Sequence, residues 1–310
     1  MPVENRLEMR RWDGSTAGRT EVWYDTFTDP ASGAGFWLHH ELVSPSDGRP
    51  AFVHGWAAAF PALGDAAPVW ERFGPLPDDG AEPFFSCGDV VCEPGVRRGA
   101  TSRLEWDLRY VDASPPLFTF PRWSWERDVL PGSQIVPSPS ASFSGEMSIV
   151  GGRDWTLVDA PGAAARIYGH GNAQRWAWLH ADLGGSDGDV LEIVAAVSRR
   201  RLLDRLPPLP MVQLRVGGRD VPSRPLASGV VALRAHVALP SWSVRGRLGG
   251  SPFRVDVTLP PERCVVIPYT DPDGAGATCT NSERADAVVT WGSRVWRLDA
   301  TAHAEVGLRP

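Results

Sequence analysis

Hydrophobic and polar residues alternate along much of the chain, which is the pattern of β-strands with one buried face. The clearest run is 104–110, where Leu, Trp, Leu and Tyr occupy the even positions and charged residues occupy the odd positions between them. The same period of two recurs at 253–259 and along 288–306. Each of these runs predicts a half-buried strand.

Helical periodicity is almost absent. Only residues 198–206 predict a helical turn or two, because Pro207 and Pro208 stop any longer helix. Turn signals such as Ser-Asp-Gly at 46–48 and 186–188 separate the apolar runs, and the chain holds 32 Gly and 29 Pro. The fold class predicted is all-β, with short strands arranged in antiparallel barrels or a sandwich.

A short repeat suggests an internal duplication. WLHHEL at 37–42 matches WLHADL at 178–183 in four identities and one exchange of Glu for Asp. A Ser-Asp-Gly turn and an apolar run follow each copy. Two similar β-barrel domains are therefore expected, over 1–150 and 151–310, with the boundary somewhere in 135–165 near a Pro/Ser-rich run.

Composition removes several function classes. All 31 basic residues are Arg, so the chain cannot form a lysine Schiff base, anchor pyridoxal phosphate or supply a P-loop lysine. The net charge is −6 and no basic stripe is visible, so no nucleic-acid partner is predicted. The 43% of apolar residues, with 14 Trp among them, can fill a large core.

Targeting and metal signals are also missing from the sequence. The opening segment MPVENRLEMRRWDGS is charged throughout and has no apolar h-region, so a cytoplasmic location is expected. No run reaches the roughly 18 apolar residues of a membrane span. The spacing of the four Cys matches no common zinc pattern, so buried thiols are expected, with no metal and no cofactor. The sequence carries no signal for the oligomeric state.

The second copy of the repeat carries the candidate chemistry. Trp176, Trp178, His180 and Asp182 occupy alternate positions of one predicted strand. If that face lines a cavity, the indoles form apolar walls, and a carboxylate desolvated between them has a raised pKa. Asp182 with His180 is then the candidate catalytic pair, acting as a general acid, and Trp176 and Trp178 are candidate ligand contacts.

Further candidate ligand contacts lie elsewhere in the chain. Trp37, His39 and Glu41 form the matching trio of the first copy, and Trp123 and Trp125 form an aromatic cluster that is interpreted as a strand lining a core or cavity. Packing is the competing interpretation for all of them, because one structural role in each barrel explains both copies of the trio.

The motifs resemble a known superfamily. FWLHHEL near the start, GEMSIVGG and YGHG in mid-chain and AHAEVG at the end look like the lipocalin-like hydroxyneurosporene synthase (carotenoid hydratase) and tocopherol cyclase superfamily. The resemblance implies two consecutive lipocalin-like antiparallel barrels and a cavity for a bulky hydrophobic molecule. It also implies, in some members, cofactor-free hydration, cyclisation or pericyclic chemistry on isoprenoids or polyketides.

The chain departs from this superfamily at one motif. Members with hydratase activity tend to carry an Asp-His-Asn-Trp-Gly-like run where this sequence has GNAQRW at 171–176. No catalytic residue is therefore carried over from the family, and hydratase activity in particular is put in doubt. A cofactor-independent cyclase or isomerase remains the enzyme class that the resemblance favours.

Two alternatives stay open. His180-x-Asp182, then His236 after 53 residues and Arg247 after ten more, has the spacing of iron(II)/2-oxoglutarate oxygenases, in which two His and a carboxylate bind iron and an Arg holds the co-substrate. The second alternative is a non-catalytic structural or interaction protein whose barrels are filled by side chains.

Overall fold

The computed structural model describes residues 7–62, 64, 66–78, 80, 84–185 and 188–309. The chain divides into two compact units. The first runs to Leu117 and from Asp128 to Gly171, and it includes Thr270–Ala275. The second holds Phe118–Arg127, Asn172–Tyr269 and the chain from Gly276 onward. Each unit is built on one large antiparallel sheet.

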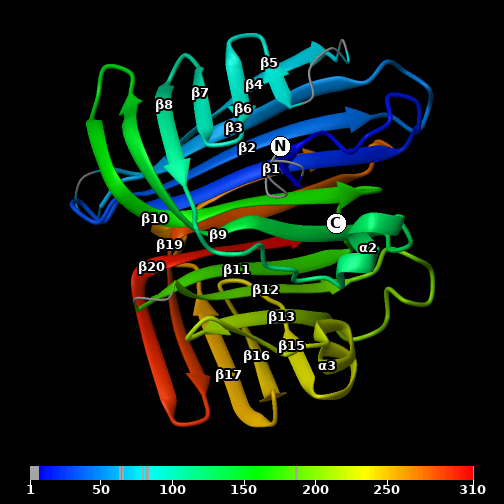
Figure 1. The fold of residues 1–310 in the computed structure, drawn as a ribbon. Helices are drawn as coiled ribbons and strands as arrows, with labels where there is room; N and C mark the ends of the chain where they lie inside the picture. Colours follow the sequence, from blue (N-terminus) through cyan, green and yellow to red (C-terminus); the bar gives the residue numbers. More distant parts are fainter. Residues whose placement is uncertain are drawn as a thin grey trace. The chain divides into compact units, whose positions relative to one another are not determined.

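The first sheet has ten strands in the order β4-β3-β2-β1-β10-β9-β8-β7-β6-β5 (Figure 1). Its end strands β4 and β5 contact each other, so the sheet closes almost completely into a barrel. The bounds are β1 Arg19–Thr28, β2 Gly35–Ser44, β3 Phe52–Phe60, β4 Val69–Pro77, β5 Phe85–Cys87, β6 Val90–Glu93, β7 Val96–Ala100, β8 Leu104–Val111, β9 Gly132–Ile149 and β10 Asp154–Gly169.

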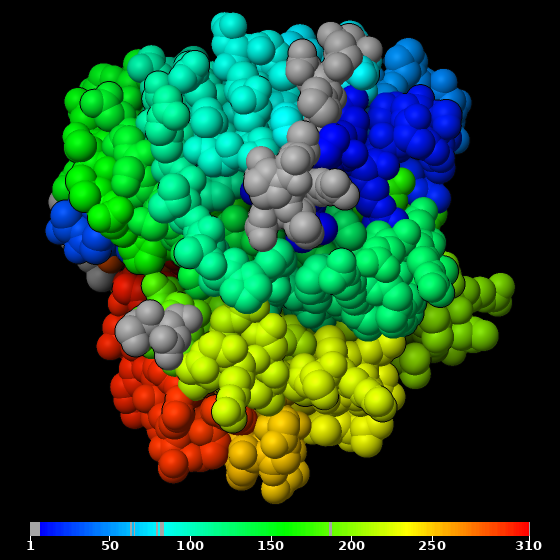
Figure 2. Space-filling view, viewed as in Figure 1, coloured from blue at the N-terminus to red at the C-terminus, as the bar shows by residue number. Residues whose placement is uncertain are grey.

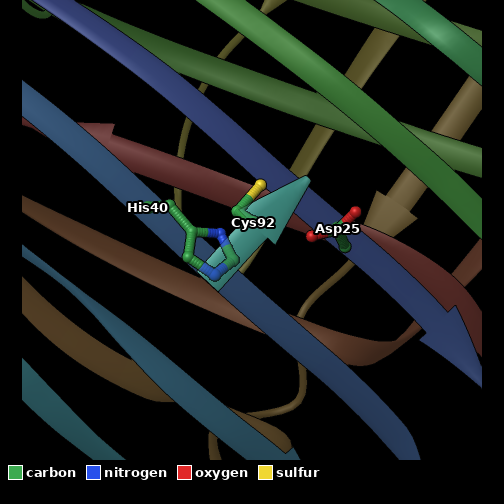
Figure 3. A group of neighbouring side chains, drawn as sticks. All are labelled: Asp25, His40 and Cys92. Carbon is green, nitrogen blue, oxygen red and sulfur yellow. The ribbon is translucent and has the colours of Figure 1, made fainter. Parts of the chain in front are cut away.

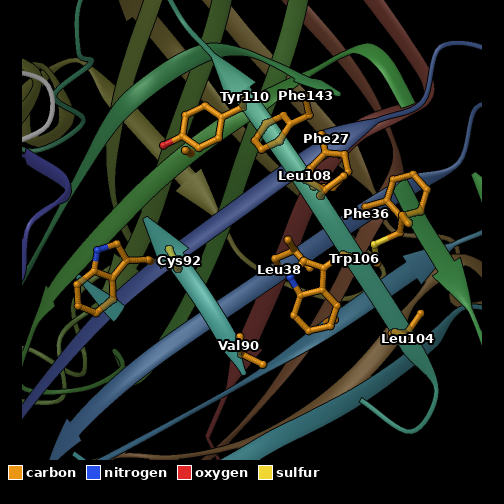
Figure 4. Close-up of a cluster of buried hydrophobic side chains, with 14 of the residues drawn as sticks. Phe27, Phe36, Leu38, Val90, Cys92, Leu104, Trp106, Leu108, Tyr110 and Phe143 are labelled. Atoms are coloured by element: carbon orange, nitrogen blue, oxygen red, sulfur yellow. The ribbon is translucent and has the colours of Figure 1, made fainter. Parts of the chain in front are cut away.

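The first barrel is filled by aromatic side chains (Figure 4). The predicted strand at 104–110 is confirmed as β8, where buried and exposed residues alternate without a break. Its inward side chains meet Phe27, Phe36 and Phe143, and the rings of Phe27 and Phe143 stack 4.5 Å apart. The interior of the barrel is therefore a packed core over much of its length. Burying each such ring contributes on the order of 2 kcal/mol to the stability of the fold.

The second sheet has the order β14-β13-β12-β11-β20-β19-β17-β16-β15, and β18 pairs with β19 beside this path. β13 and β15, near the two ends of the order, contact each other, and α3 packs on both. The bounds are β11 Arg175–Gly184, β12 Asp189–Val197, β13 Leu209–Val216, β14 Arg219–Val221, α3 Pro225–Val231, β15 Leu233–His236, β16 Ser241–Leu248, β17 Ser251–Thr258, η1 Pro261–Arg263, β18 Val265–Thr270, β19 Gly276–Trp291 and β20 Arg294–Leu308.

The division between the units differs from the expected boundary at 150. Residue 150 lies in the turn between β9 and β10, and these two strands pair with each other along most of their length. A boundary there would split a hairpin, whereas the first unit continues through β10 to Gly171. The division therefore follows the last strand of the first sheet and not the Pro/Ser-rich run, which lies within β9.

The two sheets repeat one topology, but the sequence repeat does not mark equivalent strands. In each sheet the first four strands follow one another, and the first of them pairs with the last strand of the unit, β1 with β10 and β11 with β20. β11 therefore takes the place of β1, whereas the WLHHEL copy lies in β2. Both strands carry a buried aromatic row, and that shared environment accounts for a six-residue match between non-equivalent positions.

Three local predictions are corrected. Trp123 and Trp125 lie in a short helix, α2 Arg122–Arg127, and not in a strand. Residues 201–206 form turns without a helix. The run 288–306 is a hairpin that turns at Gly292 and not one strand; within its second strand the alternation holds, since Leu298, Ala302 and Ala304 all belong to the core. The strand predicted at 253–259 is confirmed as β17.

Among the residues that the structure describes, no helix is long and apolar enough to cross a membrane. In the space-filling view, segments coloured cyan to blue-green, which include β5–β8, form the middle of this face of the first unit (Figure 2).

Candidate functional site

The predicted row of β11 is present and lies on the face of the strand opposite to the core. Ala177 and Leu179 belong to the apolar core of the second barrel, so the alternating Trp176, Trp178 and His180 point to the other side. All three are nonetheless buried, His180 with 1% of its surface exposed. Buried indole and imidazole N–H groups need acceptors, and carboxylates on the two neighbouring strands supply them.

Glu192 on β12 is the acceptor for two residues of the row. Trp178 Nε1 donates a hydrogen bond of 2.6 Å to one carboxylate oxygen, and His180 Nδ1 lies 2.9 Å from the other. Glu192 stands directly opposite His180 in the strand register. Because both of its oxygens are engaged and it is itself buried, Glu192 fixes the orientation of the two rings.

Glu305 on β20 is the acceptor for Trp176. The indole Nε1 donates a hydrogen bond of 2.6 Å to Oε1, and Cys279 Sγ lies 3.4 Å from Oε2. Glu305 also stands opposite Trp178 in the β11–β20 register. Burial raises the pKa of this carboxyl, and the hydrogen bonds from Trp176 and Cys279 only partly oppose the shift. Glu305 is therefore biased toward the protonated form that a general acid requires.

His303 extends the row on β20. It lies opposite His180, with the two rings 5.9 Å apart, and its Nδ1 is 3.4 Å from Glu283 on β19. Burial and the neighbouring His180 hold the pKa of His303 well below its ordinary value. The imidazole is thus neutral at pH 7, and the row places His, Trp and Glu side chains on four adjacent strands.

Asp182 does not take the position that the sequence suggested. It is exposed at the end of β11, and its carboxylate accepts a hydrogen bond of 2.8 Å from the backbone N–H of Gly184. The strand ends here in a register irregularity between Asp182 and Gly184, which belongs to the turn toward β12. Asp182 is therefore an exposed turn residue and not a desolvated carboxylate between Trp rings. The raised pKa and the Trp neighbour that the sequence led us to expect for Asp182 are found at Glu305 instead.

The iron-oxygenase alternative is wrong. His180 is buried on β11, whereas His236 is exposed on β15, at the far end of the strand order, and Arg247 is exposed on β16. Within the described part of the chain, no group of potential metal ligands contains His180, Asp182 or His236. The spacing along the sequence matched, but the sheet separates the residues.

The matching trio of the first unit is a closed hydrogen-bonded group on β2. Glu41 accepts a hydrogen bond from Thr20 at 2.5 Å, and its other oxygen lies 3.5 Å from His39 Nε2 and 3.4 Å from His54 Nε2. Burial opposes ionisation of Glu41, but the two imidazoles more than offset it and lower the pKa of Glu41. This carboxylate is held as an anion, which is unsuited to donating a proton.

The aromatic residues around this trio are packed against one another. The rings of His39 and Trp56 stack with centroids 3.8 Å apart, and Trp37 meets Trp56 edge to face. On α2 of the second unit, Trp125 is buried while Trp123 is 42% exposed. These residues remain candidate ligand contacts, and their packing is what the structure describes.

Four residues of the row were not predicted: Glu192, Glu283, His303 and Glu305. A signal for two of them is visible in AHAEVG at 302–307, where His303 and Glu305 stand two apart in an apolar strand. Glu192 is likewise the single charge in VLEIVAAV at 190–197. What the sequence does not contain is the register that sets these residues beside Trp176 and His180.

Comparison with known proteins places the chain in a family. A sequence profile described as tocopherol cyclase-like matches residues 97–307, and the chain belongs to this family. The uncharacterized proteins MT0513 and Rv0493c of Mycobacterium tuberculosis, from strains CDC 1551 and H37Rv, are each 48% identical to it over 302 residues, covering 96% of this chain and 89% of theirs. The superfamily suggested by the sequence motifs is thereby confirmed.

Solved structures share the fold. CghA solved with Sch210972 superposes with a TM-score of 0.66 at 14% identity, covering all of this chain and 93% of that one. The protein assigned as AttH from Nitrosomonas europaea gives 0.62 at 17%, covering 93% and 92%. Kievitone hydratase from Nectria haematococca gives 0.61 at 8%, covering 94% and 88%. The expected class, all-β with two consecutive lipocalin-like antiparallel barrels, is confirmed.

Proposed function

We propose that this protein binds a bulky hydrophobic small molecule of the isoprenoid or polyketide type and converts it without a cofactor by acid catalysis. Cyclisation or isomerisation is the favoured reaction, and hydration is the third possibility in the same chemical class. The observation that carries the proposal is the hydrogen bond between Trp176 and Glu305, because it joins an apolar aromatic wall to a carboxyl whose pKa is raised.

The chemistry requires little beyond this pair. Protonating an alkene or polarising a carbonyl needs an acid that keeps its proton near neutral pH and an apolar surface that excludes water. Glu305 is partly exposed, whereas Trp176, Trp178, His180, Glu192, Glu283 and His303 are all buried. Glu305 is thus the carboxyl of the row that a ligand reaches most readily.

Names of the family and of fold relatives support the reaction class. One of the solved neighbours is named as a hydratase, and another was solved with Sch210972. The family description refers to a cyclase. Transfer of these activities to this chain is part of the proposal, and the missing Asp-His-Asn-Trp-Gly-like run favours cyclisation or isomerisation over hydration.

A structural role for the row is the second candidate. It is favoured by the geometry at Glu192, where both carboxylate oxygens are engaged and His180 is 1% exposed. On this interpretation the row only holds β11, β12, β19 and β20 together, and the protein is a binding or interaction module without catalysis.

One experiment separates the two candidates. Tryptophan fluorescence of the full chain is titrated with isoprenoid and polyketide ligands, and any ligand that binds is incubated with the protein and analysed by mass spectrometry. Conversion that is lost in Glu305→Gln and kept in Asp182→Asn supports the proposal. Binding without conversion supports the module, and failure of every apolar ligand to change the fluorescence rejects the proposed function.

A further inference from the structure

Three potential metal ligands meet inside the first barrel. Asp25 on β1, His40 on β2 and Cys92 on β6 are each at most 1% exposed, and one ligand atom from each lies within 4.8 Å of the other two (Figure 3). β1 and β2 are neighbours, whereas β6 stands near the other end of the strand order. The near-closure of the barrel therefore brings together residues that no sequence motif connects.

Two of these side chains each have one atom engaged and one without a partner. Arg97 Nε donates a hydrogen bond of 2.6 Å to Asp25 Oδ2, and His40 Nδ1 lies 3.3 Å from the backbone oxygen of Trp23. Among the described residues, Asp25 Oδ1 and His40 Nε2 have no hydrogen-bond partner although both are buried. Because a buried polar atom without a partner is unfavourable, and because these two atoms lie in one cluster, a bound group between them would satisfy both.

The engaged atoms have the arrangement that metal ligands show. A metal-binding imidazole usually donates its other N–H to a backbone carbonyl or carboxylate, which fixes the tautomer and leaves one nitrogen lone pair for the metal. In His40, the contact between Nδ1 and the Trp23 oxygen fixes the tautomer in this way and leaves the lone pair of Nε2 available to a metal.

The surrounding charge also favours a cation. Tyr110 donates a hydrogen bond of 2.6 Å to Glu8, and Glu8 and Asp25 are both ion-paired with Arg97. Two carboxylates thus share one guanidinium in a buried space. The formal charges of Glu8 and Asp25 therefore exceed that of Arg97 by one, and a cation bound beside them offsets this excess.

The second buried arginine of this barrel does not change that balance. Arg166 is ion-paired with Glu21, and its other nitrogen donates to the backbone oxygens of Leu7 and Met9 at 2.6 Å. Its charge is therefore matched locally by Glu21.

We propose that Asp25, His40 and Cys92 bind a divalent cation of the Zn²⁺ type inside the first barrel. A thiolate, an imidazole and a carboxylate together select a borderline-soft ion, whereas Mg²⁺ and Ca²⁺ prefer oxygen ligands only. Zinc bond lengths of about 2.0–2.3 Å bring tetrahedral ligands to within about 3.8 Å of one another, so side-chain shifts on the order of 1 Å close the site. The fourth position is left for water. This site lies in the first unit and does not depend on the proposed role of Glu305.

Cobalt substitution tests the site directly. The protein is freed of metal with a chelator and titrated with Co²⁺, which stays divalent during the titration. A near-ultraviolet charge-transfer band reports a thiolate ligand, and visible bands report tetrahedral geometry. We expect both bands to saturate at one equivalent and to disappear when Zn²⁺ is added. Absence of the bands in the wild type overturns the proposal and assigns the two unpartnered atoms to buried water.

Variants identify the ligands. Cys92→Ser and His40→Gln are expected to weaken Co²⁺ binding by at least about 10- to 100-fold, the loss seen when even an outer partner of a metal ligand is removed. Cys87→Ser is the matched control, since Cys87 is another buried thiol of the same core, and its titration should equal that of the wild type. A charge-transfer band that survives in Cys92→Ser and vanishes in Cys87→Ser would overturn the assignment.

Discussion

Trp176 Nε1 and Glu305 Oε1 are joined by a hydrogen bond of 2.6 Å across the β11–β20 ladder, the seam at which the first and last strands of the second unit pair. The acid of the proposed reaction thus belongs to a different strand from the aromatic residues that surround it. Its position depends on the pairing of two segments far apart in the sequence.

Glu305→Gln is expected to change the pH dependence of stability. The pKa of Glu305 is raised in the folded state, so the folded chain holds this proton more tightly than the unfolded chain does. Its contribution to the free energy of unfolding is complete below the unfolded pKa of about 4.3 and is lost as pH rises through the folded value. Because the Gln side chain does not titrate, Glu305→Gln does not lose stability in this way as pH rises. Urea unfolding at a series of pH values should therefore show that the free energy of unfolding of the variant increases relative to that of the wild type as pH rises.

The control for this series is Asp182→Asn. Asp182 is exposed, and its substitution should change the free energy of unfolding by less than about 0.5 kcal/mol at any pH. If Glu305→Gln follows the wild type in parallel at all pH values, the raised pKa of Glu305 is refuted.

Gly307→Ala is expected to displace the Trp176 indole. Gly307 lies opposite Trp176 in the strand register, and a Cβ at this position would overlap with the indole ring. Overpacking of this kind costs about 1–3 kcal/mol. Thermal unfolding and the tryptophan emission spectrum should both shift. Gly276→Ala is the control, because the nearest atom to its Cβ would be the Tyr269 oxygen at 3.9 Å; equal shifts in the two variants would contradict the prediction.

The Trp178–Glu192 hydrogen bond should be visible in a double-mutant cycle. Both side chains are buried, and a hydrogen bond to a charged group contributes about 1.5–3 kcal/mol. Trp178→Phe and Glu192→Gln, made singly and together, should therefore give a coupling energy in that range. Additive effects within about 0.5 kcal/mol would show that the two residues do not interact.

Glu41→Gln is expected to have the opposite pH dependence to Glu305→Gln. The pKa of Glu41 is lowered in the folded state, so its contribution is present above the unfolded pKa of about 4.3 and is lost as pH falls toward the folded value. The substitution should cost about 1–3 kcal/mol near pH 7 and progressively less in acid. A cost that stays constant from neutral pH into acid would argue against the contacts of Glu41 with His39 and His54.

The sequence predicted the positions of strands better than it predicted which side chains meet across neighbouring strands. The alternation at 104–110 determines β8 because a period of two has one structural meaning when it is that regular. Trp123 and Trp125 have the same spacing, but two residues cannot distinguish a strand from one helical turn, and they lie in α2. For the row on β11 the sequence left open which face of the strand is buried, and the structure buries Trp176, Trp178 and His180 but exposes Asp182.

Asp182 lies outside the buried row for a physical reason. Asp182 and Trp178 are close in the chain, so the sequence suggests that they act together, yet Asp182 is exposed near the end of β11, where the strand passes into the turn toward β12. Glu305 reaches Trp176 through strand register, and register is set by the whole sheet and not by any local motif. The same limit explains why the cluster of Asp25, His40 and Cys92 was not foreseen.

The topology also sets the order in which the two barrels can form as the chain leaves the ribosome. The seam of the first barrel joins β1 to β10 and needs the chain only as far as Gly169, whereas the seam of the second joins β11 to β20 and waits for Leu308. During synthesis, β11 therefore presents its edge without its permanent neighbour while more than a hundred further residues are added, and unpaired strand edges invite wrong pairing. β1 waits for its partner over a still longer stretch of chain, since Thr20 pairs with Gly169 whereas Arg175 pairs with Leu308, so a ribosome-associated chaperone would find its longest-lived target in this protein at β1.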